Sequence, residues 1–196
     1  MQDKTTTFYN RIAPIYPIIN TLLKPYRSVL INKINSQPVG KLLEIGIGTG
    51  SHLPLYNKHE IVGIDISGAM LKRAESYKRD FTQLLEMNGE SLDFGEEVFD
   101  YVVLSHVIAV TKKPEKMLTE VFRVLKPKGK LFILNHFTPN NALKFLDALF
   151  NPIGKWLHFK SLFFQHDLTT LQRFSSVAQE SIGKLSYFKL LILQKP

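Results

Sequence analysis

The sequence predicts a doubly wound α/β fold built on a mainly parallel sheet, for two reasons. Strand-like apolar runs alternate along the chain with helical segments, which is the order of βαβ units. Each run is continuously apolar rather than alternating, as expected for strands that helices bury on both faces. The predicted strands are residues 41–45, 61–66, 101–105 and 130–135.

Capping residues and helical spacing mark two helices between these strands. Residues 67–77 begin with Ser67, whose side chain can accept a hydrogen bond from a backbone N–H of the first turn. Residues 114–125 have Pro114 at their start and apolar residues at the spacing of one helix face. The sequence Lys-Pro-Lys-Gly at 126–129 ends this helix before the next strand.

We expect a single domain over residues 1–196, with two segments added to the sheet. Residues 8–34 predict a helical N-terminal arm, and residues 138–167 predict a helical insertion rich in aromatic and lysine side chains. Both are expected to cover the carboxyl edge of the sheet, where doubly wound folds bind ligands. Near the C-terminus, residues 188–193 predict a strand antiparallel to residues 175–182. Prolines are expected to interrupt the arm at Pro14, Pro17 and Pro25.

Composition and charge exclude some functions and suggest others. The chain contains no cysteine, which rules out disulfides, thiolate metal sites and a cysteine nucleophile. No metal-ligand spacing is present, so no metal is predicted. A polar start and the lack of a run of about 18 apolar residues predict neither signal peptide nor membrane span, and hence a cytoplasmic location. The formal net charge of +8 predicts an anionic partner, either nucleic acid or a membrane surface.

A glycine-rich loop follows the first predicted strand. Glycines at this place let the backbone turn sharply and approach a ligand closely. A dinucleotide-binding fingerprint would need its third glycine at position 51, which is Ser51. The spacing instead resembles the E/D-x-G-x-G-x-G loop of class I methyltransferases that use S-adenosylmethionine (SAM). The residues in this pattern are Glu44, Gly46, Gly48 and Gly50.

Further cofactor contacts are expected after the next two strands. Asp65 ends the second strand, where one carboxylate can accept hydrogen bonds from both hydroxyls of a ribose. Met70 follows at a distance suited to packing on an adenine face. Residues 88–94 resemble the D-A-E-x-L-x-F segment of small-molecule methyltransferases, with Asn88 in place of the Asp that meets the adenine amino group. The predicted cofactor set also includes Ile66, Gly89 and Ser105.

Residues 9–16 resemble the Y-D-x-x-A-P-x-Y arm of methyltransferases that act on lipids and quinones. Three further segments, residues 53–56, 104–107 and 134–137, resemble one branch of these enzymes, the soluble bacterial phosphatidylethanolamine N-methyltransferases. The resemblance implies a Rossmann-like methyltransferase that takes SAM and releases S-adenosylhomocysteine. It also implies successive methylation of the phosphatidylethanolamine headgroup toward phosphatidylcholine.

Four residues are predicted to serve catalysis. Tyr9 and Tyr16 in the arm are expected to close over the cofactor, where their rings could hold a methylated ammonium. His106 and His136 follow or end strands at the ligand edge, so either could accept the proton that the amine must lose. The insertion at 138–167 is expected to lie at an anionic membrane, with aromatic rings in the interface and lysines toward phosphates.

Other functions are compatible with the same cofactor motifs. The acceptor could be a quinone precursor, an ornithine or betaine lipid, or a small amine or thiol. A chain of another class could bind SAM without catalysis. Methylation of nucleic acid is disfavoured because Ser105-His106-Val107-Ile108 stands where amino-base methyltransferases carry N-P-P-Y or D-P-P-Y. No obligate protein partner is predicted.

Overall fold

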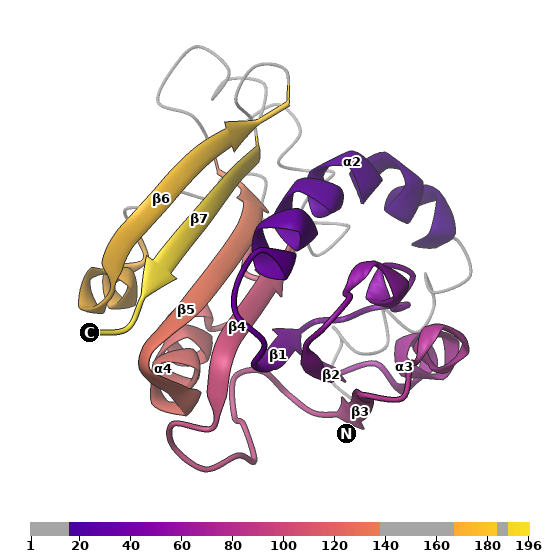
Figure 1. Cartoon of the computed structure of the whole chain (residues 1–196), viewed down its shortest axis with the longest axis horizontal. Coiled ribbons are helices and arrows are strands. Elements are labelled where there is room, and N and C mark those ends of the chain that lie inside the picture. The colour runs from indigo at the N-terminus through magenta and orange to yellow at the C-terminus, as the bar shows by residue number, and fades with distance from the viewer. Residues whose placement is uncertain (1–15, 138–166, 184–187) are drawn as a thin grey trace.

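The fold is one seven-stranded sheet with strand order β3-β2-β1-β4-β5-β7-β6 (Figure 1). This computed structural model describes residues 16–137, 167–183 and 188–196, with backbone alone for residues 16–22. The strands are β1 (Lys41–Ile45), β2 (Glu60–Asp65), β3 (Thr82–Glu86), β4 (Phe99–Ser105), β5 (Leu125–His136), β6 (Ser175–Ile182) and β7 (Phe188–Gln194). The helices are α2 (Tyr16–Asn35), α3 (Gly68–Ala74) and α4 (Pro114–Val124), with short 3₁₀ helices η1 (Leu53–Leu55), η2 (Glu75–Tyr77) and η4 (Thr169–Arg173).

The strand directions confirm the doubly wound prediction. The pairs from β3 through β5 are parallel, and β7 runs antiparallel between β5 and β6. The predicted antiparallel pair at the C-terminus is therefore present, and it extends the sheet beyond β5. The sequence prediction missed β3, because this short edge strand carries the partly polar sequence Thr-Gln-Leu-Leu-Glu and only its first residue is buried.

Two apolar layers on opposite faces of the sheet hold the fold together. Along β5, Ile133 packs in a cluster with Leu118 and Val121 of α4. The neighbouring Phe132 packs on the other face, with Ile31 of α2. Successive residues of a strand point to opposite faces, so burial of both faces requires an apolar residue at each position. This requirement explains the continuous apolar runs.

Helix α2 differs from the predicted arm. It continues from Tyr16 to Asn35 with Pro25 inside it, so the predicted interruption at Pro25 is wrong. The proline ring fixes a helical φ and removes one backbone donor, while Leu30, Ile31 and Ile34 beyond it are buried against the sheet. The burial of these three side chains outweighs the tendency of Pro25 to interrupt the helix. Residues 8–15 of the arm and 138–166 of the insertion lie outside the described residues.

The connections after β1 and β2 position the ligand edge. The glycine loop after β1 leads into η1, which has only three residues. After β2, the predicted N-cap is confirmed, since the Ser67 side chain accepts a hydrogen bond from Met70 N at 3.2 Å. Helix α3 ends at Ala74, and η2 continues it as a 3₁₀ helix to Tyr77, the predicted end of this helical segment. Across the described ranges, no helix is long and apolar enough to cross a membrane.

The two-sided core predicts a contrast between two phenylalanines. Phe132 is fully buried, whereas Phe81 is 75% exposed. Phe132→Ala should lower the free energy of unfolding by about 3–5 kcal/mol, because it removes buried surface and leaves a cavity. Phe81→Ala, the matched control, should change it by less than about 0.5 kcal/mol. Urea denaturation measures both, and equal effects would contradict the assignment of the core.

Candidate cofactor site

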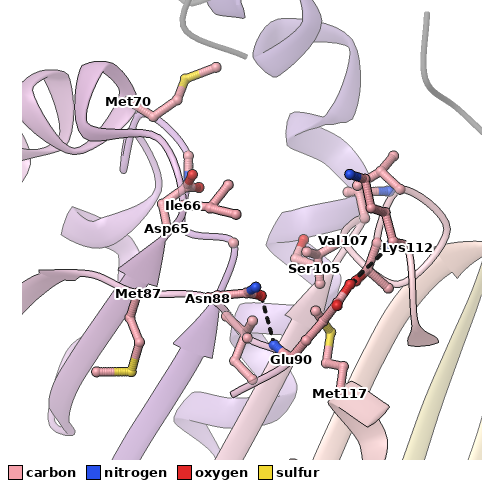
Figure 2. Close-up of a pocket in the computed structure, with 17 residues that line it drawn as sticks. Asp65, Ile66, Met70, Met87, Asn88, Glu90, Ser105, Val107, Lys112 and Met117 are labelled. Atoms are coloured by element: carbon pink, nitrogen blue, oxygen red, sulfur yellow. Dashed lines mark hydrogen bonds between the residues drawn. The ribbon is translucent and has the colours of Figure 1, made fainter. Parts of the chain in front are cut away.

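A pocket lies at the carboxyl edge of the parallel strands, where β1, β2, β3 and β4 end (Figure 2). It holds about 830 Å³ of space free of protein atoms, including open solvent at its mouth. Asp65 and Ile66 lie on one side and Ser105, Val107 and Lys112 on the other. The predicted residues that line it are Gly46, Gly48, Asp65, Ile66, Met70, Asn88, Gly89, Ser105 and His106.

The glycine loop fits the pocket through its backbone conformation. Gly46, Gly48 and Gly50 all have positive φ, of 75°, 60° and 64°, which glycine adopts without a Cβ penalty. A Cβ at Gly46 would lie 2.7 Å from Cγ2 of Val107, which also lines the pocket. Gly50 does not line the pocket, and a Cβ there would lie 2.7 Å from Cβ of Ala74. Gly46 and Gly48 therefore serve the pocket, while Gly50 allows close packing on α3.

Asp65 is held by the backbone on two sides. Its Oδ2 accepts a hydrogen bond from Gly48 N at 2.8 Å, and its Oδ1 accepts one from Ser67 N at 2.9 Å. Burial raises the pKa of this carboxyl, while the hydrogen bonds from Ser67 and Gly48 act in the opposite direction. The remaining lone pairs can accept hydrogen bonds from a diol in the pocket.

Glu90 joins two loops at the pocket wall. Its Oε1 accepts hydrogen bonds from Thr111 Oγ1 at 2.6 Å and from the backbone of Lys112 and Lys113, each at 3.0 Å. Burial alone would raise its pKa, but these hydrogen bonds lower it overall. Asn88 Oδ1 accepts from Glu90 N at 2.9 Å, which ties the predicted adenine contact to the same residue. Glu90 thus fixes the loop after β4 against the loop after β3.

Several lining residues were missed from the sequence. Glu90 stands at the Glu position of the D-A-E-x-L-x-F segment, and that motif could have identified it. Met117 was recognised only as part of a helix face, although it also reaches the pocket. Val107 belongs to the segment 104–107 that carries the family resemblance, and Val110, Thr111 and Lys112 carry no motif, so their place depends on how the chain leaves β4. The missed residues are Ile45, Met87, Glu90, Val107, Val110, Thr111, Lys112 and Met117.

His106 enters the pocket from a left-handed turn directly after β4. Its φ is 60°, an uncommon value for a residue with a Cβ. Its N donates to Leu134 O at 2.7 Å, and its ring meets Phe188 edge-on with centroids 5.4 Å apart. Within the described part of the chain, its buried Nε2 has no hydrogen-bond partner. Burial, followed by the charge of Arg27, lowers its pKa to about 3, so the imidazole is neutral at physiological pH.

Glu44 does not line the pocket. It is 1% exposed and accepts hydrogen bonds from His52 Nε2 at 2.7 Å and Tyr56 Oη at 2.8 Å. Burial, reinforced by the Glu44 charge, raises the pKa of Tyr56 well above its usual value. The alternation of β1 explains this placement, because Ile45 lines the pocket and its neighbour Glu44 points to the opposite face. The predicted cofactor contact of Glu44 is not formed through the walls of this pocket.

The structure describes the side chains of two of the four predicted catalytic residues, His106 and His136. Of these two, His106 lines the pocket. His136 is 3% exposed at the end of β5, does not line the pocket, and lies close enough that its charge contributes to the lowered pKa of His106. Tyr9 lies outside the described residues, and of Tyr16 the backbone alone is described, as the first residue of α2. Their catalytic roles stay predictions.

Comparison with known proteins identifies the domain. Residues 43–133 match the family model described as a methyltransferase domain. This part of the chain is a class I SAM-dependent methyltransferase domain. A SAM-dependent methyltransferase of Thermotoga maritima has the same fold, with a TM-score of 0.74 at 23% identity over 97% of this chain and 99% of that one.

Two curated relatives differ in the reaction that their names state. The chain is 38% identical to the phosphatidylethanolamine N-methyltransferase of Cereibacter sphaeroides over 104 residues, which is 50% of this chain and 51% of that protein. It is 30% identical to the ubiquinone/menaquinone biosynthesis C-methyltransferase of Syntrophotalea carbinolica over 151 residues, which is 71% of this chain and 64% of that protein. The chain thus spans about half to two thirds of the length of these relatives.

The pocket of this methyltransferase domain fits SAM. Asp65 presents a fixed carboxylate at the end of β2, suited to a ribose diol. Ile66 and Val107 line the pocket with apolar side chains, which can pack on an adenine ring. Within the described residues, the buried Ser105 Oγ has no hydrogen-bond partner, so it can bond a polar group of a ligand. Gly46 leaves room where a Cβ would meet Val107.

The low pKa of His106 predicts a pH dependence of stability. An unfolded histidine titrates near 6.5 and the folded His106 near 3, so between these values only the unfolded state takes up the proton. Its contribution to stability is therefore lost as pH falls below about 6.5. His106→Gln should flatten this part of the stability curve measured by urea denaturation. In NMR, the His106 ring should not titrate above about pH 5; titration near 6.5 would contradict the assignment.

Proposed function

We propose that this chain methylates the amino nitrogen of phosphatidylethanolamine at an anionic membrane surface, with SAM as the methyl donor. The similarity to the named phosphatidylethanolamine N-methyltransferase, at 38% identity over 104 residues, is the observation that carries the choice of acceptor. The pocket at the sheet edge supports the choice of cofactor, and the net charge of +8 supports an anionic surface.

In this proposal the cofactor is held by groups already fixed in the fold. The backbone of Gly46 and Gly48 would approach its amino-acid part, and Asp65 would accept hydrogen bonds from its ribose. Ile66 and Asn88 would contact adenine. When bound, SAM supplies a methyl group on a positively charged sulfur, which a neutral amine can attack. The protein then contributes mainly by alignment of the reactants and exclusion of water.

The neutral imidazole of His106 defines its role in the proposed reaction. Its unpartnered Nε2 can accept a hydrogen bond from an amine N–H, which would orient the nitrogen lone pair. A pKa of about 3 makes this ring a weak base near neutral pH. His106 would therefore bind and orient the acceptor, and the amine proton would pass to water.

A second candidate is C-methylation of a quinone precursor. The similarity to the named C-methyltransferase, at 30% identity over 151 residues, favours it. Both acceptors must lose a proton before methylation, the amine from its ammonium form and the phenol from its hydroxyl, so the neutral ring of His106 does not separate them. The higher identity to the named phosphatidylethanolamine N-methyltransferase, 38% against 30%, makes phosphatidylethanolamine the preferred acceptor.

Cofactor binding can be tested at Asp65. Asp65→Ala should weaken SAM binding by about 1–3 kcal/mol, because hydrogen bonds from the ribose to a charged group are lost. Asp93→Ala removes a carboxylate that is exposed and does not line the pocket, and it should bind SAM like the parent protein. Isothermal titration calorimetry measures both, with circular dichroism as a check of folding. Equal affinities of the two variants would remove Asp65 from the site.

The acceptor can be tested with SAM labelled in its methyl group. Phosphatidylethanolamine vesicles should incorporate the label, and demethylated quinone precursors in matched vesicles should not. His106→Ala should lower turnover while SAM affinity changes by less than about twofold, because the ring serves the acceptor. Label found only in the quinone would instead support the second candidate. Tight SAM binding with no label in any acceptor would support a non-catalytic module.

A further inference from the structure

A second cleft lies on the other side of the glycine loop from the cofactor pocket. Its walls come from α2, the segment that enters η1, and the end of α3 with η2, which lie together in Figure 1. It holds about 1360 Å³ of space free of protein atoms, including open solvent at its mouth. Because η1 has only three residues, the chain between the glycine loop and β2 places no long helix between α2 and α3.

The cleft is strongly cationic. Lys24 and Arg27 project from α2, and Lys72 and Arg73 from the last turn of α3. The described lining includes no aspartate or glutamate. Like charges that lie close together repel one another, so an anionic ligand would be attracted to this lining.

Three cationic side chains of the cleft, one on α2 and two on α3, are available for a ligand. In the part of the chain that the structure describes, Lys24, Lys72 and Arg73 form no ion pair with a carboxylate. Lys72 and Arg73 are exposed, so their substitution removes charge without removing core packing. Arg27 differs, because it is 6% exposed and forms the inner wall.

His52 adds an independent observation within the cleft. Its side chain is 7% exposed, and its Nε2 is bonded to Glu44 Oε1 at 2.7 Å. Its other ring nitrogen, Nδ1, is buried and has no hydrogen-bond partner among the described residues. This buried ring nitrogen can form a hydrogen bond with a polar group of a ligand in the cleft. The hydroxyls of Thr49 and Ser51 also line the cleft.

We propose that this cleft binds the phosphate group of a phospholipid headgroup. Several cations, a buried ring nitrogen and hydroxyl groups are chemistry that can recognise a phosphate group. The cleft is also near the cofactor pocket, since Gly48 lines the pocket and its neighbour Thr49 lines the cleft. In phosphatidylethanolamine two carbons separate the phosphate ester from the nitrogen. A phosphate held at the edge of the cleft beside this loop would place the amine close to the pocket; this choice of ligand rests on the proposed function.

The test compares two double variants of equal charge. Lys72→Gln/Arg73→Gln removes two cations from the cleft, and Lys58→Gln/Lys116→Gln removes two exposed cations that do not line it. Soluble glycerophosphoethanolamine and inorganic phosphate are titrated calorimetrically into each protein, without turnover. The cleft variant should bind glycerophosphoethanolamine at least about tenfold more weakly, because charge-assisted hydrogen bonds are lost. The control variant should bind it like the parent.

Further arms separate the sources of phosphate and the possible roles of the cleft. In the vesicle assay the cleft variant should raise KM for phosphatidylethanolamine and keep kcat, with unchanged SAM affinity. Parent protein that binds inorganic phosphate but not glycerophosphoethanolamine would overturn the lipid assignment. Loss of SAM affinity in the cleft variant would also overturn it, since the cations would then serve the cofactor. The calorimetric experiments measure binding without methyl transfer. They therefore test the phosphate site even if phosphatidylethanolamine is not the methyl acceptor, and the proposed site and the proposed reaction can fail separately.

Discussion

The carboxylate of Asp65 is the connection on which the ligand edge depends. It accepts hydrogen bonds from Gly48 N and Ser67 N, and so joins the glycine loop after β1 to the start of α3. Ser67 in turn caps α3 through Met70 N. Burial makes the charged form of Asp65 costly, and these backbone donors compensate for part of that cost. Asp65 thereby fixes the glycine loop against the start of α3. It also holds a carboxylate at the ligand edge, in a place suited to a ribose.

The glycine loop separates two environments with different chemistry. Gly46 and Gly48 face a pocket with apolar walls and a carboxylate, which suits a nucleoside. Thr49, Ser51 and His52 face a cleft whose charged side chains are all basic in the described lining, which suits an anion. A donor and a charged acceptor can approach from opposite sides of such a loop. Arg27 and His52 lie near enough to His106 to affect its pKa, so the two environments are electrostatically coupled.

Burial changes the chemical role that the sequence predicts for His106. A histidine at the end of a parallel strand is a natural candidate for a general base. Burial, followed by the charge of Arg27, instead lowers its pKa to about 3 and leaves a neutral ring. The left-handed backbone at φ 60° and the edge-on contact with Phe188 hold that ring in place. Orientation of an acceptor is the chemistry that such a ring can supply.

The sequence by itself determined the parallel core and most of the cofactor pocket, because both depend on local patterns. Burial on both faces requires continuous apolar strands, and the loop requires glycines such as Gly46 and an acid such as Asp65 at fixed spacing. Only the tertiary structure decided the role of Glu44, which turns away from the pocket to His52 and Tyr56. It alone also revealed the basic cleft, since the cations of α2 and α3 are distant in sequence and carry no motif. Their meeting depends on how helices pack over a short connection, which is a property of the folded chain.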